Sequence, residues 1–161
     1  MKIRHLIGAA VIVSGVTFGA VRHHQQIYPP TYGVANPFVT QLNIQSTICK
    51  AGWTKTIRPS TSYTNKIKAE QLSDEDDLDM GDFEEDHIIS LQLGGHPTAP
   101  GNLWAQPYEV TLNKVKMGAR QKDVVETHLK RQVCAGKMDL KDAQYQIGHD
   151  WVKVYLQIVK P

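Results

Sequence analysis

The chain has 161 residues, of which 18 are lysine or arginine and 16 are aspartate or glutamate, and its formal net charge is +2. This length fits one domain of ordinary size and excludes a large multidomain protein. The near balance of charge excludes a strongly basic or strongly acidic chain. It does not decide whether the partner is a nucleic acid, because that depends on where the charges lie.

Residues 1–21 have the pattern of an export signal. Lys2 and Arg4 precede an apolar run at residues 6–21, and this order of charged and apolar residues is typical of secretory signal peptides. The run is also almost long enough to span a bilayer. The sequence therefore predicts an exported protein, periplasmic or secreted, whose first segment is either a signal peptide or an inner-membrane anchor.

Residues 22–38 are expected to be a linker or an extended lead-in. They contain His23, His24 and the Pro29-Pro30 pair but show no helical or strand periodicity, which favours a tether over a packed element. The paired histidines could hold a metal ion, although a solvated linker is the simpler interpretation. The folded domain is then expected at residues 39–161.

The first part of this domain is expected to hold short extended pieces and one helix. Residues 39–58 mix isoleucine and tryptophan with serine and threonine. This mixture favours strands, with a helical turn before Cys49 as the alternative. Ser60 or Thr61 can then cap a helix that runs to about Leu72.

An acidic loop and two strands are predicted next. Residues 74–86 carry nine acidic side chains and a glycine, a composition typical of a loop. Residues 83–93 include alternating apolar and polar positions, which predict a half-buried strand. A second short strand is predicted at Leu103-Trp104 and ended by Pro107.

Two helices are predicted to complete the domain. The first covers about residues 117–133, and Gly136 can end it. The second begins at Asp139 and runs to about Ile158. Its apolar residues recur in steps of three and four, which indicates one face packed in the core.

The chain contains two cysteines, Cys49 and Cys134. An even number of cysteines in an exported protein favours a disulfide, so we predict that these two are bonded to each other. Two buried thiols would be expected instead if the protein stayed in the cytoplasm. The two residues are too few and too far apart to resemble a zinc finger.

Residues 83–95 and 102–104 carry the most informative motif. They read Phe-Glu-Glu-Asp-His-Ile-Ile-Ser-Leu-Gln-Leu-Gly-Gly and, after a proline-containing loop, Asn-Leu-Trp. This order of residues resembles the core of HNH-type (His-Me finger) nucleases over residues 83–108. The chain is also similar to small exported bacterial proteins with this core. The shared stretches are Cys-x-x-Gly-Trp-Thr-x-Thr-x-Arg-Pro at residues 49–59, Lys-Asp-x-x-Glu at residues 122–126 and Cys-x-Gly at residues 134–136.

The resemblance implies a small single α+β domain with a ββα-metal core, flanking helices and one disulfide. It implies that His87 is the general base that takes a proton from water, since imidazole titrates near neutral pH. It also implies that Asp86 binds one divalent ion, with Mg²⁺ favoured over Mn²⁺, Ca²⁺ and Zn²⁺. Asn102 is expected to hold the loop through hydrogen bonds to backbone near His87.

The sequence departs from this family at the third metal ligand. The family motif closes with a histidine, or sometimes an asparagine, at the start of the next helix, but no histidine lies between His96 and His128. Asn113 is the nearest suitable residue, whereas the match at residues 122–126 would place the ligand near Gly118, which has no side chain. Other donors that Mg²⁺ accepts here are Glu109, Asp123 and water.

Basic residues gather around the helix predicted after the hairpin. Such residues can contact the phosphates of a nucleic acid. A solvated helix face explains them equally well, and the acidic run before His87 would repel DNA unless it faces away. The residues predicted to contact the nucleic-acid backbone are Lys114, Lys116, Arg120 and Lys122.

The leading prediction is an exported, divalent-metal-dependent endonuclease that cleaves DNA, with RNA as the second choice of substrate. Little sequence preference is expected, because no base-reading element is recognisable. The alternative is a non-catalytic envelope or secreted binding module that keeps an HNH-like scaffold. An inhibitor protein that protects the producer would be a further partner, and the sequence identifies none.

Overall fold

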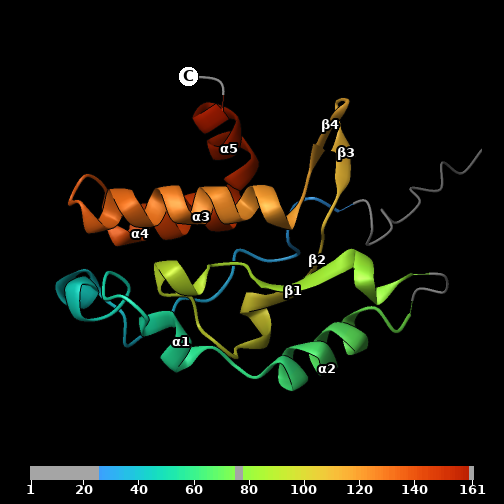
Figure 1. Ribbon diagram of the computed structural model, residues 1–161, viewed down its shortest axis with the longest axis horizontal. Helices are drawn as coiled ribbons and strands as arrows, with labels where there is room; N and C mark the ends of the chain where they lie inside the picture. The colour runs from blue at the N-terminus through green and yellow to red at the C-terminus, as the bar shows by residue number, and fades with distance from the viewer. Residues whose placement is uncertain (1–25, 75–77, 160–161) are drawn as a thin grey trace, which may run out of the picture.

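The computed structural model describes residues 26–74 and 78–159, so the predicted export segment and part of the acidic run lie outside the described residues. Helices come first, then the four strands, and further helices complete the fold (Figure 1). The helices are α1 (Trp53–Ile57), α2 (Thr61–Gln71), α3 (Ala119–Cys134), α4 (Leu140–His149) and α5 (Trp151–Val159). The strands are β1 (Phe83–His87), β2 (Leu103–Pro107), β3 (Val110–Leu112) and β4 (Val115–Met117).

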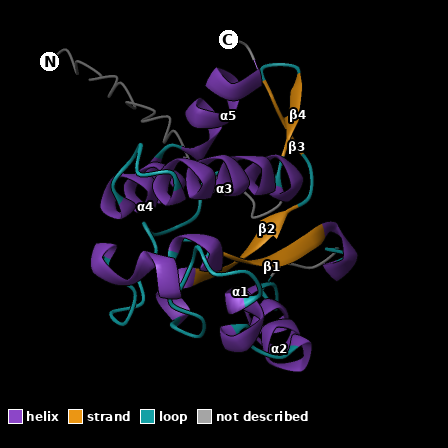
Figure 2. Ribbon diagram, turned by 60° about the vertical axis from the view of Figure 1, so that its left-hand side comes forward, coloured by secondary structure: helices purple, strands orange, loops and turns teal. Residues whose placement is uncertain are grey.

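The β1–β2 hairpin lies between two groups of helices (Figures 1 and 2). Helix α2 packs against both strands, and α3 contacts β1 from the other side through Lys122 and Asp86. The strands are antiparallel, with His87 opposite Leu103. Side chains alternate between the two faces of a strand, so His87 and Asp86 point in opposite directions. The fold is a small α+β domain, as predicted, with β1–β2 and β3–β4 as two short antiparallel sheets.

The main core lies among the three C-terminal helices. Val125, Leu129 and Val133 line the inner face of α3, in one apolar cluster with Ile147 and Trp151. Complete burial of side chains of this size contributes roughly 1.5–3 kcal/mol each. This cluster joins α3, α4 and α5 in one core beside the hairpin. A smaller cluster under α2 contains Leu72, Phe83 and Ala105.

Residues 26–38, the described part of the segment expected to be a linker or an extended lead-in, make contacts with the rest of the domain. Ala35 forms a β-bridge with Gly95, and Trp151 Nε1 donates a hydrogen bond to the Ile27 carbonyl at 3.2 Å. These partners are distant in the sequence, so local periodicity does not reveal them.

Strand β1 is shorter than the strand predicted for residues 83–93. It ends at His87, and Leu91–Leu93 form a 3-10 helix. Ser90 caps this helix, since its hydroxyl accepts a hydrogen bond from Gln92 N at 3.0 Å. The apolar residues after His87 are therefore buried in a tight turn rather than in a strand.

Three other segments differ from the sequence predictions. Gln41–Ser46 form a 3-10 helix, which agrees with the alternative of a helical turn before Cys49 rather than with the extended pieces that were favoured. Residues 53–57 form α1, where extended pieces were expected. The predicted C-terminal helix is broken at Asp150 into α4 and α5, and the break lets α5 pack against α3. The β3–β4 hairpin was not predicted, because its turn residues Asn113 and Lys114 adopt positive φ without a glycine.

The predicted helix cap and the predicted disulfide are both confirmed. Ser60 Oγ accepts a hydrogen bond from Tyr63 N at the start of α2. Cys49 and Cys134 are bonded, with Cα atoms 5.6 Å apart, which joins the turn before α1 to the last residue of α3. Within residues 26–74 and 78–159, no helix is long and apolar enough to cross a membrane.

Removal of the disulfide should lower the free energy of unfolding by about 4–5 kcal/mol. The bond closes a loop between residues that are 85 positions apart, so it restricts the unfolded chain strongly. Urea unfolding with and without dithiothreitol measures the effect. The Cys49→Ser/Cys134→Ser double variant is the control and should not respond to the reductant. A reductant effect below about 1 kcal/mol on the native protein would contradict the prediction.

Candidate functional site

His87 lies at the end of β1, where the strand gives way to the loop. The residue is 5% exposed, and Nε2 lies 2.9 Å from the Pro97 carbonyl oxygen. A carbonyl oxygen only accepts, so Nε2 carries the hydrogen and Nδ1 is the basic nitrogen of the neutral ring. Burial lowers the pKa of His87 below its ordinary value. The neutral ring is therefore the dominant form near pH 7.

Asn102 fixes the loop that follows His87. Its side chain is 0% exposed and makes four hydrogen bonds to backbone. Oδ1 accepts from Val34 N and Ile89 N, at 3.0 and 2.9 Å, and Nδ2 donates to the carbonyls of Ile89 and His96, at 3.0 and 2.9 Å. The hydrogen bonds to backbone near His87 that the resemblance implies are present.

Two neighbouring residues complete this loop. A Cβ atom on Gly95 would lie 1.6 Å from the Ile89 carbonyl oxygen, so only glycine fits there. His96 Nδ1 accepts hydrogen bonds from Thr98 N at 3.2 Å and Ala99 N at 2.9 Å. His96 Nδ1 thus stabilises the turn.

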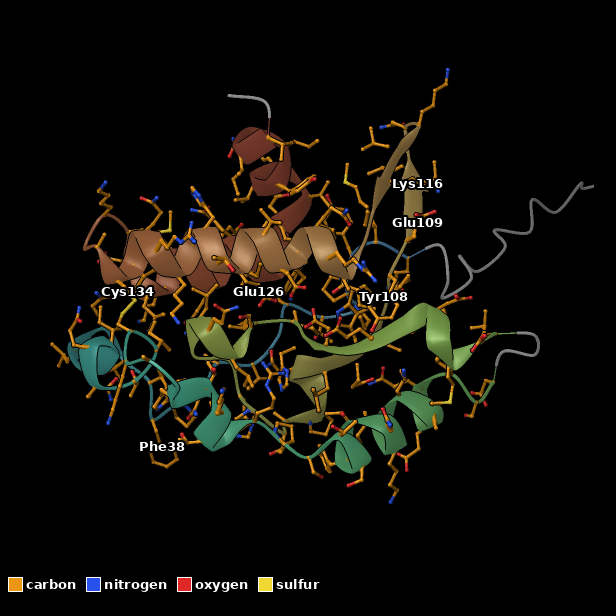
Figure 3. All side chains as sticks on the ribbon, in the orientation of Figure 1. Phe38, Tyr108, Glu109, Lys116, Glu126 and Cys134 are labelled. Carbon is orange, nitrogen blue, oxygen red and sulfur yellow. A yellow bond between two sulfur atoms is a disulfide. The ribbon has the colours of Figure 1, made fainter. Side chains whose placement is uncertain are left out.

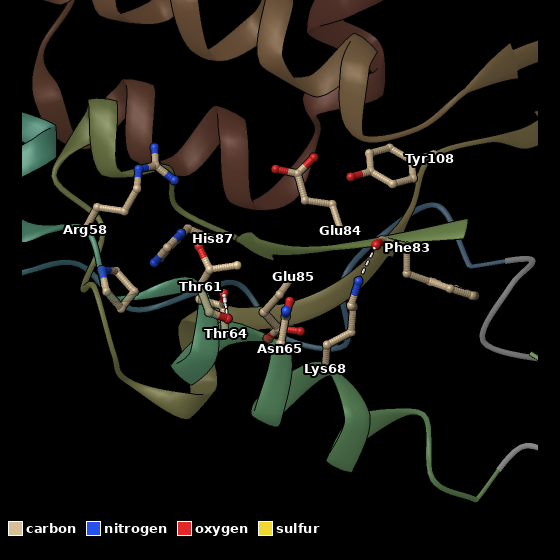
Figure 4. Close-up of a pocket in the computed structure, with 11 residues that line it drawn as sticks. Arg58, Thr61, Thr64, Asn65, Lys68, Phe83, Glu84, Glu85, His87 and Tyr108 are labelled. Atoms are coloured by element: carbon tan, nitrogen blue, oxygen red, sulfur yellow. Dashed lines mark hydrogen bonds between the residues drawn. The ribbon is translucent and has the colours of Figure 1, made fainter. Parts of the chain in front are cut away.

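A cavity of about 210 Å³ opens beside His87, between β1 and α2 (Figure 4). Arg58, which follows α1, lies at its edge near the imidazole (Figure 4). It is exposed and forms no ion pair with any described residue. The Lys68 ammonium, in contrast, is held by the carbonyls of Met80 and Phe83 at 2.8 Å each. Other lining residues are Thr61, Thr64, Asn65, Glu84, Glu85 and Tyr108.

The two glutamates that line this cavity have raised pKa values. Burial, with a further contribution from the charge of Asp86, raises the pKa of Glu84 to about 7 and that of Glu85 to about 8. Glu85 Oε1 accepts a hydrogen bond from Gln71 at 3.2 Å, while Oε2 is buried and has no partner among the described residues. Both carboxyls are thus partly neutral near pH 7. The positive charge of Arg58 then favours an anion in the cavity.

The opposite face of β1 is occupied by a buried ammonium. Lys122 Nζ lies 2.6 Å from Asp86 Oδ2, 2.8 Å from Glu126 Oε1 and 2.9 Å from the His87 carbonyl oxygen. The Lys122 side chain is 1% exposed. Burial opposes its charge, but Asp86 and Glu126 outweigh burial and raise the pKa of Lys122 above the ordinary value. Glu126 is on the face of α3 that points toward the hairpin (Figure 3).

The donors near His87 do not fit the divalent ion implied by the resemblance. One oxygen of Asp86 contacts the Lys122 ammonium, and an ammonium repels a second cation at this distance. Asn113 lies in the turn of the β3–β4 hairpin, which projects away from β1 (Figure 1). Within the described ranges, no group of three or more histidine, cysteine, aspartate or glutamate side chains is arranged to hold a metal ion.

The cations predicted to contact nucleic acid have different surroundings. Lys114 is exposed in the β3–β4 turn, and Lys116 pairs with Glu109 at 2.7 Å on the same hairpin (Figure 3). The Arg120 guanidinium lies 5.9 Å from the Tyr108 ring centroid. Lys122 is buried, so it cannot contact a nucleic acid in this arrangement.

Local sequence patterns do not reveal that Arg58 lines the cavity beside His87 or that Lys122 is buried. Both residues lie in the stretches at 49–59 and 122–126 that carry the resemblance. The position of Arg58 relative to His87 depends on how α1 packs in the fold. Lys122 was taken as a surface cation, as lysines usually are.

Comparisons of the chain with protein-family models, with curated proteins and with solved structures find no match.

Asn102→Ala should lower the free energy of unfolding by about 3 kcal/mol or more, because it leaves several buried backbone groups without partners. Urea unfolding followed by circular dichroism measures the loss. Asn65→Ala truncates an exposed asparagine on α2 and is the matched control, expected within about 0.5 kcal/mol of the native protein. Equal stability of the two variants would refute the structural role of Asn102.

Glu85→Gln should stabilise the protein at high pH. The pKa of Glu85 is raised from 4.5 to about 8 on folding, so its contribution to stability is full below pH 4.5 and is lost as the pH rises through about 8. Glutamine stays neutral at every pH, so the variant does not lose this stability as the pH rises. After allowance for solvent screening of a partly exposed group, the gain between pH 6 and pH 9 should be about 1–2 kcal/mol.

Thermal unfolding of the native protein and of Glu85→Gln at the two pH values checks this prediction. Glu70→Gln changes an exposed glutamate on α2 and is the control, with the same small effect at both pH values. If the difference in Tm between Glu85→Gln and the native protein is no larger at pH 9 than at pH 6, the prediction is contradicted.

Proposed function

We propose that the protein hydrolyses phosphodiester bonds of nucleic acid, as an exported endonuclease that acts on DNA in preference to RNA. His87 is the general base. The observation that carries this proposal is the hydrogen bond from Nε2 to Pro97, which directs the basic Nδ1 atom away from that carbonyl in a ring whose burial favours the neutral form. A fixed, neutral imidazole beside a cavity is suited to take a proton from water.

Arg58 supplies the positive charge that the reaction needs. Attack of water on a phosphodiester places additional negative charge on the phosphate oxygens, and a nearby guanidinium stabilises that charge and binds two oxygens at once. Arg58 lies at the edge of the cavity that His87 lines (Figure 4). In this proposal His87 Nδ1 accepts the proton of the attacking water while the water oxygen bonds to phosphorus. The P–O bond to the leaving sugar oxygen breaks, and that oxygen takes a proton from solvent. Arg58 binds the phosphate, and no step is assigned to a divalent ion.

The remaining cations can guide the strand toward this cavity. Tyr108 lines the cavity and also lies under the Arg120 guanidinium. Lys116 and Arg120 border a second hollow that shares Tyr108 with the first. The two hollows are therefore adjacent. Lys116 is paired with Glu109, which also borders the second hollow. Arg58, Lys114 and Arg120 form no ion pair with any described residue, so they are the cations along this surface that a nucleic-acid backbone could contact.

Export is part of the proposal, through residues 6–21 as a signal peptide or a membrane anchor. A disulfide between residues that are 85 positions apart supports it, because such bonds persist in oxidising compartments such as the periplasm or the cell exterior.

The second candidate is a non-catalytic binding module. The contact between Lys122 and Asp86 favours it, because it occupies the residue expected to bind the divalent ion. Such a module would bind nucleic acid through the surface just described and leave the strand intact.

His87→Ala should reduce cleavage of nucleic acid by about 10²–10⁴-fold, the usual contribution of a general base. The full-length protein, produced in an oxidising compartment, is incubated with plasmid DNA and with RNA, in Mg²⁺, in Mn²⁺ and in EDTA. His128→Ala replaces a histidine of α3 that does not line the cavity and is the matched control. Binding without cleavage in every condition, by a folded and disulfide-bonded protein, would favour the binding module.

A further inference from the structure

We propose that Lys122 is the resident cation of this site, so that the folded protein holds an internal ammonium between Asp86 and Glu126 and binds no divalent ion there. The inference deepens the proposed function. Its catalytic part, that cleavage needs no divalent ion, rests on that function. Its binding part, that no divalent ion binds between Asp86 and Glu126, concerns the folded protein alone.

The geometry around Lys122 is complete. An ammonium group has three N–H donors, and Nζ has three acceptors within 2.9 Å, namely Asp86 Oδ2, Glu126 Oε1 and the His87 carbonyl oxygen. They come from both β1 and α3. Each donor therefore has an acceptor, and the ammonium needs no further ligand.

The second carboxylate is held in place as well. Glu126 lies one helical turn after Lys122 on α3, and its other oxygen accepts a hydrogen bond from Gln92 Nε2 at 3.4 Å. The pair is buried, at 1% and 8% side-chain exposure. Glu126 therefore cannot turn away from Lys122 to bind another cation without losing both contacts.

A divalent ion between these carboxylates would have to displace the ammonium. The Lys122 side chain is only 1% exposed, so the ammonium has almost no contact with solvent between α3 and β1. Expelling it would leave a charged group buried without a partner, which is strongly destabilising. The Lys-Asp-x-x-Glu stretch at residues 122–126 thus supplies both the cation and one of its carboxylates.

The position of this ammonium relates it to His87. Lys122 donates hydrogen bonds to the side chain of Asp86 and to the main-chain carbonyl of His87, so it fixes the peptide that carries the imidazole. Lys122 is therefore a positioning residue, because it acts through His87 and is too buried to reach a substrate.

Titration with Mn²⁺ tests the inference without any need for catalysis. Isothermal titration calorimetry on the native full-length protein should detect no binding at this site, and Mn²⁺ should not change the Tm. Lys122→Ala leaves Asp86, Glu126 and the His87 carbonyl around an empty space, so this variant should bind Mn²⁺. Its Tm should rise by roughly 5 °C or more at saturation.

The control for charge loss is Lys116→Ala, which removes an exposed lysine and should not respond to Mn²⁺. If Lys122→Ala is unfolded without Mn²⁺, recovery of its folded circular-dichroism spectrum on addition of Mn²⁺ supports the inference, and failure to recover overturns it. Saturable binding to the native protein that disappears in Asp86→Asn would also overturn it, as would the absence of any Mn²⁺ response in folded Lys122→Ala.

The catalytic part is tested by cleavage in EDTA. Cleavage by the native protein that proceeds in EDTA supports the inference, whereas cleavage that stops in EDTA and returns with Mg²⁺ overturns it. A native protein that cleaves under no condition counts against the proposed function, and the Mn²⁺ titration then decides the inference on its own.

Discussion

The placement of α3 against β1 depends on the buried ion pairs that the Lys122 ammonium forms with Asp86 and Glu126. An unpaired charge in a protein interior costs several kcal/mol, which is comparable to the whole net stability of a domain. Lys122 therefore stays only where Asp86 and Glu126 meet it. Because these carboxylates belong to different elements, their attraction to one ammonium fixes the distance between strand and helix. The same ammonium binds the His87 carbonyl, so it also helps to set where β1 ends.

The two faces of β1 consequently have opposite character. On one face Asp86 is engaged with the ammonium. On the other, His87 and Glu85 line a cavity, and Glu85 keeps one buried oxygen without a described partner. A strand whose side chains alternate can thus serve stability with one face and chemistry with the other. Asn102 determines where this strand ends, because its four backbone hydrogen bonds prevent the segment after His87 from continuing as a strand.

Local signals in the sequence predicted the parts of the fold that local physics decides. Ser60 precedes a helix, and its hydroxyl does cap that helix. The two cysteines in a chain with an export-like segment pointed to the bond that is present. The end of β1 was misplaced because tertiary hydrogen bonds to Asn102, and not periodicity, stop the strand. The burial of Lys122 also escaped prediction, since a lysine is matched to carboxylates in the interior only once β1 and α3 have met.

Helix α3 is held at two separate points. Lys122, near its beginning, forms a hydrogen-bonded ion pair with Asp86 on β1, and Cys134, its last residue, forms a disulfide with Cys49. These residues are twelve positions apart, which corresponds to about 18 Å along a helix. A slip of one residue would rotate the helix by about 100° and pull the ammonium from its carboxylates. Attachment at both points opposes sliding and rotation of α3, so the backbone of His87 is already fixed in the folded protein. A ligand that bound beside the imidazole would then lose mainly its own freedom of motion.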